Sequence, residues 1–448
     1  MKKLYFLLGL LLFSQLSIGQ QYDISRLTLQ ESIDIALENN INIQRTQLNL
    51  LNTQAGLLEA RGNMIPTLNL GIGPSRRWGR NLNPVTNLYE EANTLNTMNV
   101  VANSNITLFA GRQIANTIKQ SKLLVEAGWY DVAASENEIS LSVINLFVNI
   151  VFAKEQVNIA NSQLQTNSEQ LSRTRRLVEA GTLPTGDRLD LEAQEATSEL
   201  ELINARNNLR IAKLNLSQML QIPFAENFDI SFPDLQAENY AMVDENVDEI
   251  FAIALNTLPQ IKAAELGVES AEYGEKIAKG AFMPTISANA SAFSNYARVV
   301  SRPELPFNPF LTQLEGNLAP SVSLSLNIPI LSNFRNTANL QRARVQTRQR
   351  ELQQVETRNQ LLQDIETGYT NALAAKQSYN ASVRRVAALE EAFRMSQQRF
   401  NVGAVNSVDF QVAQNNLFNA QADLLNAKYE YIFRVKVLDF YLGNPITL

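Results

Sequence analysis

The chain has 448 residues, 45% of them hydrophobic, and a net charge of −6. This length allows two or three domains with sizeable cores, and the acidic balance argues against a nucleic-acid-binding surface. Cysteine and histidine are absent, which excludes disulfide bonds, a lipid-modified cysteine, an imidazole base and the commonest zinc ligand.

The first residues have the three regions of a secretory signal peptide. A charged start with Lys2 and Lys3 is followed by an apolar run over residues 4–13 and by the small residues Ser17 and Gly19. We expect a signal peptide over residues 1–19. No later stretch approaches the roughly 20 apolar residues of a membrane helix, so any membrane insertion is not expected to use helices.

The two halves of the chain resemble each other, which predicts two structural repeats. The first repeat is expected over residues 20–223 and the second over residues 247–448, with a linker over residues 224–246. The matching positions lie 218 residues apart in the early part of each repeat and 222 apart in the later part. Gly62, Pro66 and Thr67 match Gly280, Pro284 and Thr285, and Gly181, Asp187 and Pro223 match Gly403, Asp409 and Pro445.

The predicted elements follow the same order in both repeats. The capping box formed by Thr28 and Glu31 indicates the start of the first helix. The first repeat is predicted to contain a helix over 28–62, strands over 66–74 and 98–109, and helices over 112–180 and 185–221. The second is predicted to contain a helix over 247–280, strands over 284–296 and 318–330, and helices over 335–402 and 407–442.

The predicted strands alternate between apolar and small polar residues. Between 318 and 330, Val322, Leu324 and Leu326 alternate with serines. Strands of about ten residues with this pattern are typical of an outer-membrane barrel, and equally of a soluble sheet with one solvated face. The signal peptide and the long polar loops over 75–97 and 297–316 favour the barrel. Four strands cannot close a barrel, which needs about eight, so several chains must share it.

The predicted helices are unusually long and carry heptad seams. At about 1.5 Å per residue, the helix over 112–180 reaches on the order of 100 Å. The returning helix over 185–221 has apolar positions on two sides, which predicts two neighbours and hence a ring or sheet of helices. One side contains Leu202, Ala205, Leu209, Ala212 and Leu216, and the other contains Leu189, Ala193, Ala196, Leu200 and Ile203.

A turn that occurs twice connects the long and the returning helices. Each copy has a glycine suited to the left-handed residue past a helix end, a hydroxyl residue suited to the next N-cap, and an acid in the following turn. The glycines are Gly181 and Gly403, the hydroxyl residues are Thr185 and Ser407, and the acids are Asp187 and Asp409, with Asp190 one turn later. Such acids ordinarily complement the positive end of a helix dipole.

Together, these features resemble the TolC family of outer-membrane efflux and secretion channels. The resemblance covers nearly the whole mature chain, and the order and duplicate spacing of its motifs are more specific than any single motif. The motifs are residues 29–37, the strand entries 64–67 and 283–285, residues 108–112, the two tip turns, and Leu442 with Gly443.

The resemblance implies a chain that is mainly α-helical with a β-barrel portion. Three protomers would share a twelve-stranded β-barrel in the outer membrane and an α-helical barrel across the periplasm, with the linker 224–246 in an equatorial belt. The implied function is the channel of a tripartite efflux or secretion system. Its partners would be outer-membrane lipid, a periplasmic adaptor (membrane fusion protein) and an inner-membrane pump, with no nucleic acid.

The resemblance also implies that the tip turns form the periplasmic gate. Asp187, Asp190 and Asp409 would lie at the constriction, where acids favour cations over anions. The alternative is that these acids only complement helix N-termini. Both roles can be true of one residue.

The second tip departs from the pattern of the family. Phe400 and Val405 stand where some members place a tyrosine and an arginine that latch the tips together. A polar latch of that kind is therefore not expected. We expect closure to depend more on packing and on other charges such as Arg188 and Arg399.

Nothing in the sequence indicates an enzyme, a cofactor or a metal site. The acid pairs Asp187 with Asp190 and Glu390 with Glu391 could in principle act as acid and base, but no substrate pocket is indicated around them. The competing function is a periplasmic coiled-coil adaptor or structural protein. The duplicated hairpin and the barrel-like strand pairs favour the channel.

Overall fold

The computed structural model describes residues 25–80, 87, 89, 93–232, 237, 240, 242, 245–301, 303 and 306–444. The predicted signal peptide lies outside the described residues. The chain divides into two compact units. We name them the tip unit, which contains residues 25–46, 131–261 and 358–444, and the sheet unit, which contains residues 47–130 and 262–357. Each unit takes segments from both sequence repeats, so the repeats predicted from the sequence are not separate domains.

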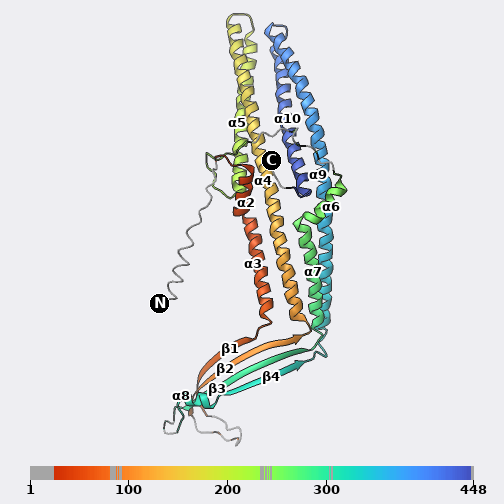
Figure 1. The fold of residues 1–448 in the computed structure, drawn as a ribbon. Helices are drawn as coiled ribbons and strands as arrows, with labels where there is room; N and C mark the ends of the chain where they lie inside the picture. Colours follow the sequence, from red (N-terminus) through yellow and green to blue (C-terminus); the bar gives the residue numbers. More distant parts are fainter. Residues whose placement is uncertain are drawn as a thin grey trace. The chain divides into compact units, whose positions relative to one another are not determined.

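The sheet unit contains one four-stranded antiparallel sheet in the order β1-β2-β3-β4 (Figure 1). The strand pair expected in each repeat is present, and β2 also pairs with β3, which joins the two repeats. Strands β1 to β3 extend beyond their predicted loop-side ends, whereas β4 stops short of residue 330. The strands are β1 (Thr67–Gly79), β2 (Asn93–Ala110), β3 (Thr285–Val299) and β4 (Ala319–Asn327).

The register of the sheet gives it two chemically different faces. Side chains alternate between the faces of a strand, so residues paired directly across the strands share a face. One row contains Leu70, Ala102, Ala292 and Pro320, and the next contains Asn69, Asn103, Ser291 and Ser321. The hydroxyls of Ser291 and Ser321 lie 2.8 Å apart on the polar face. The apolar face remains exposed within this chain, including Leu70, Val322 and Leu324.

The end of β2 departs from regular pairing. The register shifts between Thr107 and Phe109, so Phe109 lies opposite Ile286. Leu108 has no partner in the register, because the bulge inserts one residue into the alternation of β2.

A short helix that the sequence did not predict lies in the loop between β3 and β4. Helix α8 (Phe310–Gly316) occupies the end of the loop expected over 297–316. The ring of Phe310 meets that of Tyr296 edge-on, with centroids 5.1 Å apart, and the hydroxyl of Ser294 donates to the carbonyl of Leu314 at 2.6 Å. The loop therefore folds back onto β3.

Each predicted opening helix is broken in two. The helix expected over 28–62 is replaced by α2 (Leu29–Asn39) and α3 (Ile41–Gly62), and the one expected over 247–280 by α6 (Val247–Thr257) and α7 (Pro259–Gly280). The capping box of Thr28 and Glu31 is confirmed at the start of α2.

The two breaks have different chemical causes. At the first, Asn40 is extended, and its side-chain oxygen accepts a hydrogen bond from the N–H of Asn42 at 2.9 Å, a local bond that competes with the helix. At the second, Leu258 is extended because Pro259 disfavours helical backbone in the residue before it.

Four long helices form two hairpins whose far ends belong to the tip unit (Figure 1). They are α4 (Gln113–Glu179), α5 (Thr185–Met219), α9 (Arg335–Asn401) and α10 (Ser407–Tyr441), each ending within two residues of its predicted bounds. In α4, the seam positions Val143, Ile150 and Leu171 are buried. The second seam of α5 is not covered within this chain, because Leu189, Leu200 and Ile203 are 54%, 57% and 56% exposed.

Helix α4 contains a more apolar stretch than the sequence analysis expected. Among the described residues it is the one helix long and apolar enough to cross a membrane, with a mean hydropathy of 1.2 over an 18-residue window. However, 44% of that window is buried within the protein. Val143, Phe147 and Ile150 of α4 lie in the largest core of the tip unit, so packing explains the apolar character of the helix.

Candidate functional site

The two tip turns end their helices in the same way. Gly181 and Gly403, the expected left-handed residues, have φ values of 71° and 73°. The N–H of Thr182 donates to the carbonyl of Leu177 at 2.9 Å, and the N–H of Ala404 donates to that of Arg399 at 2.8 Å. These bonds satisfy carbonyls that the helix end leaves free, which makes both turns compact.

The N-caps of the returning helices differ from the prediction. Thr185 and Ser407 were expected to cap α5 and α10, but each is the first helical residue. Asn406 caps α10 by accepting a hydrogen bond from the N–H of Asp409 at 2.7 Å. Pro184 stands at the N-cap of α5 without a side-chain bond. Asn406 is an equally good cap placed one residue earlier, which leaves the hydroxyl of Ser407 free for another partner.

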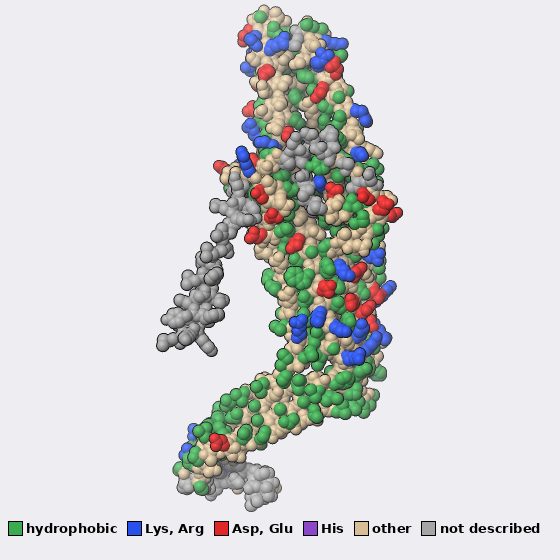
Figure 2. Space-filling model, in the orientation of Figure 1, with side chains coloured by type: hydrophobic (Ala, Val, Ile, Leu, Met, Phe, Trp, Pro, Cys, Tyr) green, Lys and Arg blue, Asp and Glu red, His purple; other side chains and the backbone are tan. Residues whose placement is uncertain are grey.

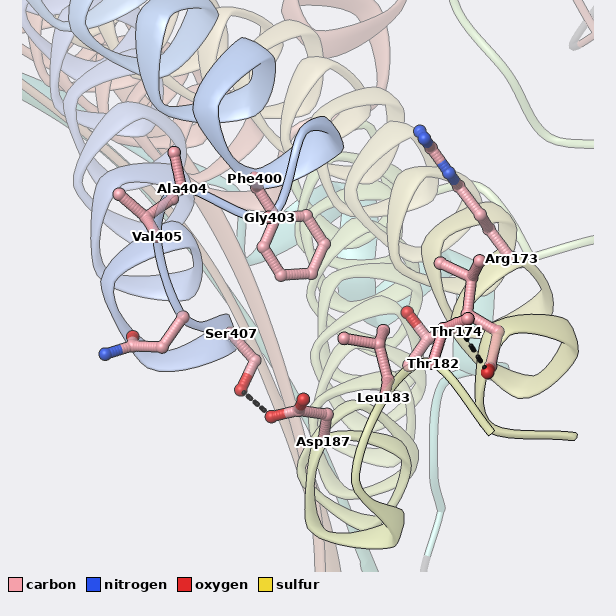
Figure 3. A pocket seen from close by; sticks show the side chains of 12 residues that line it. Arg173, Thr174, Thr182, Leu183, Asp187, Phe400, Gly403, Ala404, Val405 and Ser407 are labelled. Atoms are coloured by element: carbon pink, nitrogen blue, oxygen red, sulfur yellow. Dashed lines mark hydrogen bonds between the residues drawn. The ribbon is translucent and has the colours of Figure 1, made fainter. Parts of the chain in front are cut away.

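The partner of Ser407 lies on the other tip. Its hydroxyl donates to the Oδ1 atom of Asp187 at 2.8 Å, and Ser407 is only 3% exposed (Figure 3). The two residues are 220 positions apart in the chain. A polar contact therefore joins the two tips of one chain, and it uses other residues than the tyrosine and arginine that some members of the family place there.

A cavity of about 500 Å³ lies between the two tips. Figure 3 shows Leu183 and Asp187 of the first tip on one side and Phe400, Val405 and Ser407 of the second on the other. The ring of Phe400 stacks on that of Phe410, with centroids 4.8 Å apart and planes 18° apart. Phe400 is therefore held by packing within its own hairpin.

The charged residues of the tips fall into two groups. Arg188 lies 3.9 Å from the carboxylate of Glu192, which also pairs with Arg175 at 3.1 Å, so Arg188 is engaged within its own hairpin. Asp190, Asp409 and Arg399 are exposed at the ends of the helices. Among the described residues, no hydrogen bond or ion pair involves the carboxylates of Asp190 and Asp409, so both are free to act on ions in solution.

A polar layer lies beside the tips, where apolar packing would be expected. The amide of Asn167 donates to the hydroxyl of Ser198 at 2.6 Å, and Gln194 on α5 donates to Asn415 on α10 at 3.4 Å. Gln414 is 1% exposed, and both of its amide atoms lack a partner among the described residues. A buried amide without partners lowers stability, so Gln414 stabilises its surroundings less than an apolar residue at the same place would.

The surroundings of Glu391 do not favour general acid catalysis. Glu391 accepts two hydrogen bonds from Arg394, and these bonds lower the pKa of Glu391. A general acid at neutral pH needs a raised pKa instead. Within the part of the chain that the structure describes, no group of three or more acidic side chains could hold a metal ion.

A sheet with one exposed apolar face, continuous with long helical hairpins, has the features of an outer-membrane channel protein. A sequence profile of the family described as "Outer membrane efflux protein" matches residues 32–220 and 252–444. The matched segments include all four strands and both hairpins. The chain belongs to this family.

Individual proteins support the same assignment. The outer membrane efflux protein BepC of Brucella suis is 23% identical over 330 residues, which cover 73% of this chain and 68% of that protein. The outer membrane protein TolC of Escherichia coli is 23% identical over 396 residues, which cover 86% and 76%. The solved structure of the outer membrane protein VceC of Vibrio cholerae matches with a TM-score of 0.77 at 18% identity, over 94% of this chain and 97% of that one.

These similarities confirm the resemblance to the TolC family. The protein is an outer-membrane component of an efflux or secretion system, and it is located in the outer membrane and extends into the periplasm. The competing interpretation, a periplasmic adaptor, does not fit a member of this family.

Proposed function

We propose that three copies of this chain form the channel of a tripartite efflux or secretion system. The copies share a twelve-stranded barrel in the outer membrane and a helical barrel in the periplasm, where an adaptor and an inner-membrane pump dock. The observation that carries this proposal is the unfinished sheet: β1 and β4 each have one edge without a strand partner among the described residues. Exposed edges recruit further strands, and closure into a barrel removes them. The exposed second seam of α5 gives a neighbouring helix a matching surface.

The repeats predict how neighbouring copies pair. The pairing of Thr67 with Asn105 in the first repeat becomes that of Thr285 with Asn327 in the second when the offsets of 218 and 222 are applied. The pairing of β2 with β3 extends this rule to the neighbouring copy. Ser104 pairs with Ala290, and adding 222 to the first position and subtracting 218 from the second predicts that Leu326 pairs with Ile72 of the neighbouring copy. Both side chains belong to the apolar face, which is the outcome that a closed barrel requires.

Cysteine crosslinking tests the predicted pairing of β1 with β4 of the neighbouring copy, because the natural chain has no cysteine. Leu326→Cys combined with Ile72→Cys is expected to give disulfide-linked dimers and trimers, since directly paired residues have Cβ atoms about 5 Å apart. Non-reducing electrophoresis of membranes from oxidised cells is the measurement.

The matched control for the crosslink is Leu326→Cys with Gly73→Cys. A shift of one residue turns the side chain to the other face of the sheet, so this pair is expected to stay unlinked. Monomers alone in the first variant, or equal linking in both, would contradict the proposed barrel.

We further propose that the two tips form the periplasmic gate and that the bond between Ser407 and Asp187 helps to hold it closed. Phe400 packs within its hairpin and supports the contact, while the polar layer beside the tips allows them to separate. The exposed acids Asp190 and Asp409 supply negative charge at the mouth.

Ser407→Ala is expected to raise the open probability of the reconstituted channel. The loss of a hydrogen bond to a charged group costs about 1.5 kcal/mol, and in a trimer the loss occurs three times. Planar-bilayer recordings measure the effect. Thr185→Ala is the matched control, because Thr185 is the repeat equivalent of Ser407, is exposed and lies outside the contact between the tips. Equal open probability in the wild type and Ser407→Ala would exclude the latch.

A further inference from the structure

Lys and Arg side chains are clustered at the ends of α4 and α7 that adjoin the strands of the sheet unit. The whole chain has a net charge of −6, yet Lys and Arg side chains are grouped over these helix ends on the face drawn in Figure 2. On α4 and α7 the cations are Lys119, Lys122, Lys276 and Lys279. All of them lie within about 15 Å of the helix ends that adjoin the strands, given 1.5 Å per residue.

Two of these lysines converge on one aromatic ring. The ammonium groups of Lys119 on α4 and Lys276 on α7 lie 5.7 Å and 4.0 Å from the centre of the Tyr273 ring. No ion pair with either lysine is formed by the described residues, whereas Lys279 pairs with Glu275 at 3.7 Å. The two ammonium groups repel each other, and an anion bound between them would attract both and offset this repulsion.

Apolar side chains lie in the chain at the end of β2 and between α7 and β3. Phe109, Phe282 and Met283 are 41%, 46% and 51% exposed, although β2, β3, α4 and α7 all meet here within one chain. Neighbouring copies would join at β1 and β4, so they would leave these residues uncovered. Exposed aromatic and apolar residues next to lysines are the composition of a membrane interface, where the lysines reach the headgroups.

We propose that Lys119 and Lys276, with Tyr273 between them, bind the phosphate group of an anionic phospholipid. The lipid belongs to the membrane leaflet that the helix ends meet, and Lys122 adds to the attraction. This inference rests on the proposed function, because it requires the sheet to lie in the membrane. The phosphate of a free anion has the same chemistry, but the exposed Phe282 and Met283, which follow α7 in the chain, match the acyl chains of a lipid.

The test uses the full-length protein in vesicles of phosphatidylcholine with or without phosphatidylglycerol. Channel conductance measures insertion, and mass spectrometry measures the lipids retained after mild detergent extraction. The wild type is expected to retain phosphatidylglycerol in preference to phosphatidylcholine. Lys119→Gln with Lys276→Gln is expected to lower this preference about threefold or more. Lys376→Gln with Arg384→Gln, exposed positions on α9 in the tip unit, is the control with the same change of charge and is expected to behave as the wild type.

The outcomes separate this inference from the proposed function. Conductance with equal retention of the two lipids, or an equal loss of preference in the control, overturns the inference alone. Absence of conductance in both vesicles overturns the proposed function and the inference with it. Inorganic phosphate that binds the protein in neutral vesicles, and fails to bind Lys119→Gln with Lys276→Gln, would assign the site to free anions and overturn the lipid proposal.

Discussion

Asp187→Asn combined with Asp409→Asn is expected to raise the anion permeability of the reconstituted channel and to weaken block by divalent cations. In a trimer this variant removes six carboxylates from the periplasmic mouth. Each contributes about 0.15 kcal/mol to a passing ion at about 10 Å in salt solution, with opposite sign for cations and anions, so the six together change the ratio of cation to anion permeability on the order of twentyfold. Reversal potentials in asymmetric salt measure this ratio. Unchanged selectivity would reject the role of the acids and leave them as helix-dipole partners.

The effect of this variant on selectivity must be separated from an effect on closure, because Asp187 also accepts the hydrogen bond from Ser407. Ser407→Ala removes the bond and keeps the charge. It is expected to change the open probability without changing selectivity. The reverse is expected of Asp409→Asn alone, since the carboxylate of Asp409 has no bond in the described part of the chain. If both variants changed the same property, the separation into latch and charge would be wrong.

Gly111→Ala is expected to destabilise the protein by more than about 3 kcal/mol, among the larger effects of a single substitution. Gly111 has a φ of 56°, a conformation that costs an L-residue about 1 kcal/mol. In addition, a Cβ there would collide with the backbone carbonyl oxygen of Gly280 and lie 2.7 Å from the Cβ of Met283. Neither atom is the end of a flexible side chain, so backbone must move. Thermal unfolding and the yield of membrane-inserted protein measure the loss.

Gly267→Ala is the control for this prediction. Gly267 lies within α7, and no atom stands within 4 Å of an added Cβ. Alanine in such a helical position should stabilise the protein by roughly 0.5–1 kcal/mol. Equal stability of the Gly111 and Gly267 variants would show that the turn after β2 adapts more easily than its geometry indicates.

The sequence predicts the fold wherever a short-range pattern determines it. Period-two alternation located all four strands and their apolar face, and heptad spacing located the long helices. The bulge at Leu108 could not be predicted in this way, because it depends on the pairing of β2 with β3 rather than on β2 itself. Of the two helix breaks, the one at Leu258 could have been predicted, since Pro259 signals it directly. The break at Asn40 has a weaker signal, because asparagine disfavours a helix without excluding it as proline does.

The candidate site was predicted in its parts but not in its connections. The glycines and the acids of the tips follow from local turn chemistry. The bond between Ser407 and Asp187 joins residues 220 positions apart, and no local pattern contains it. Ser407 was assigned to its own helix because serine is a favoured N-cap, and Asn406 was a competitor of similar strength. The hydroxyl of Ser407 instead bonds to Asp187 on the other tip, a contact that depends on how the two hairpins pack.

The two helix breaks occupy equivalent positions in the two repeats. Asn40 and Leu258 are 218 positions apart, which is the offset that relates the early parts of the two repeats. The two repeats therefore bend at the same place for different chemical reasons, an asparagine side chain in one and a proline in the other. The shape of the backbone at this point is common to both repeats, although the residues that produce it are not.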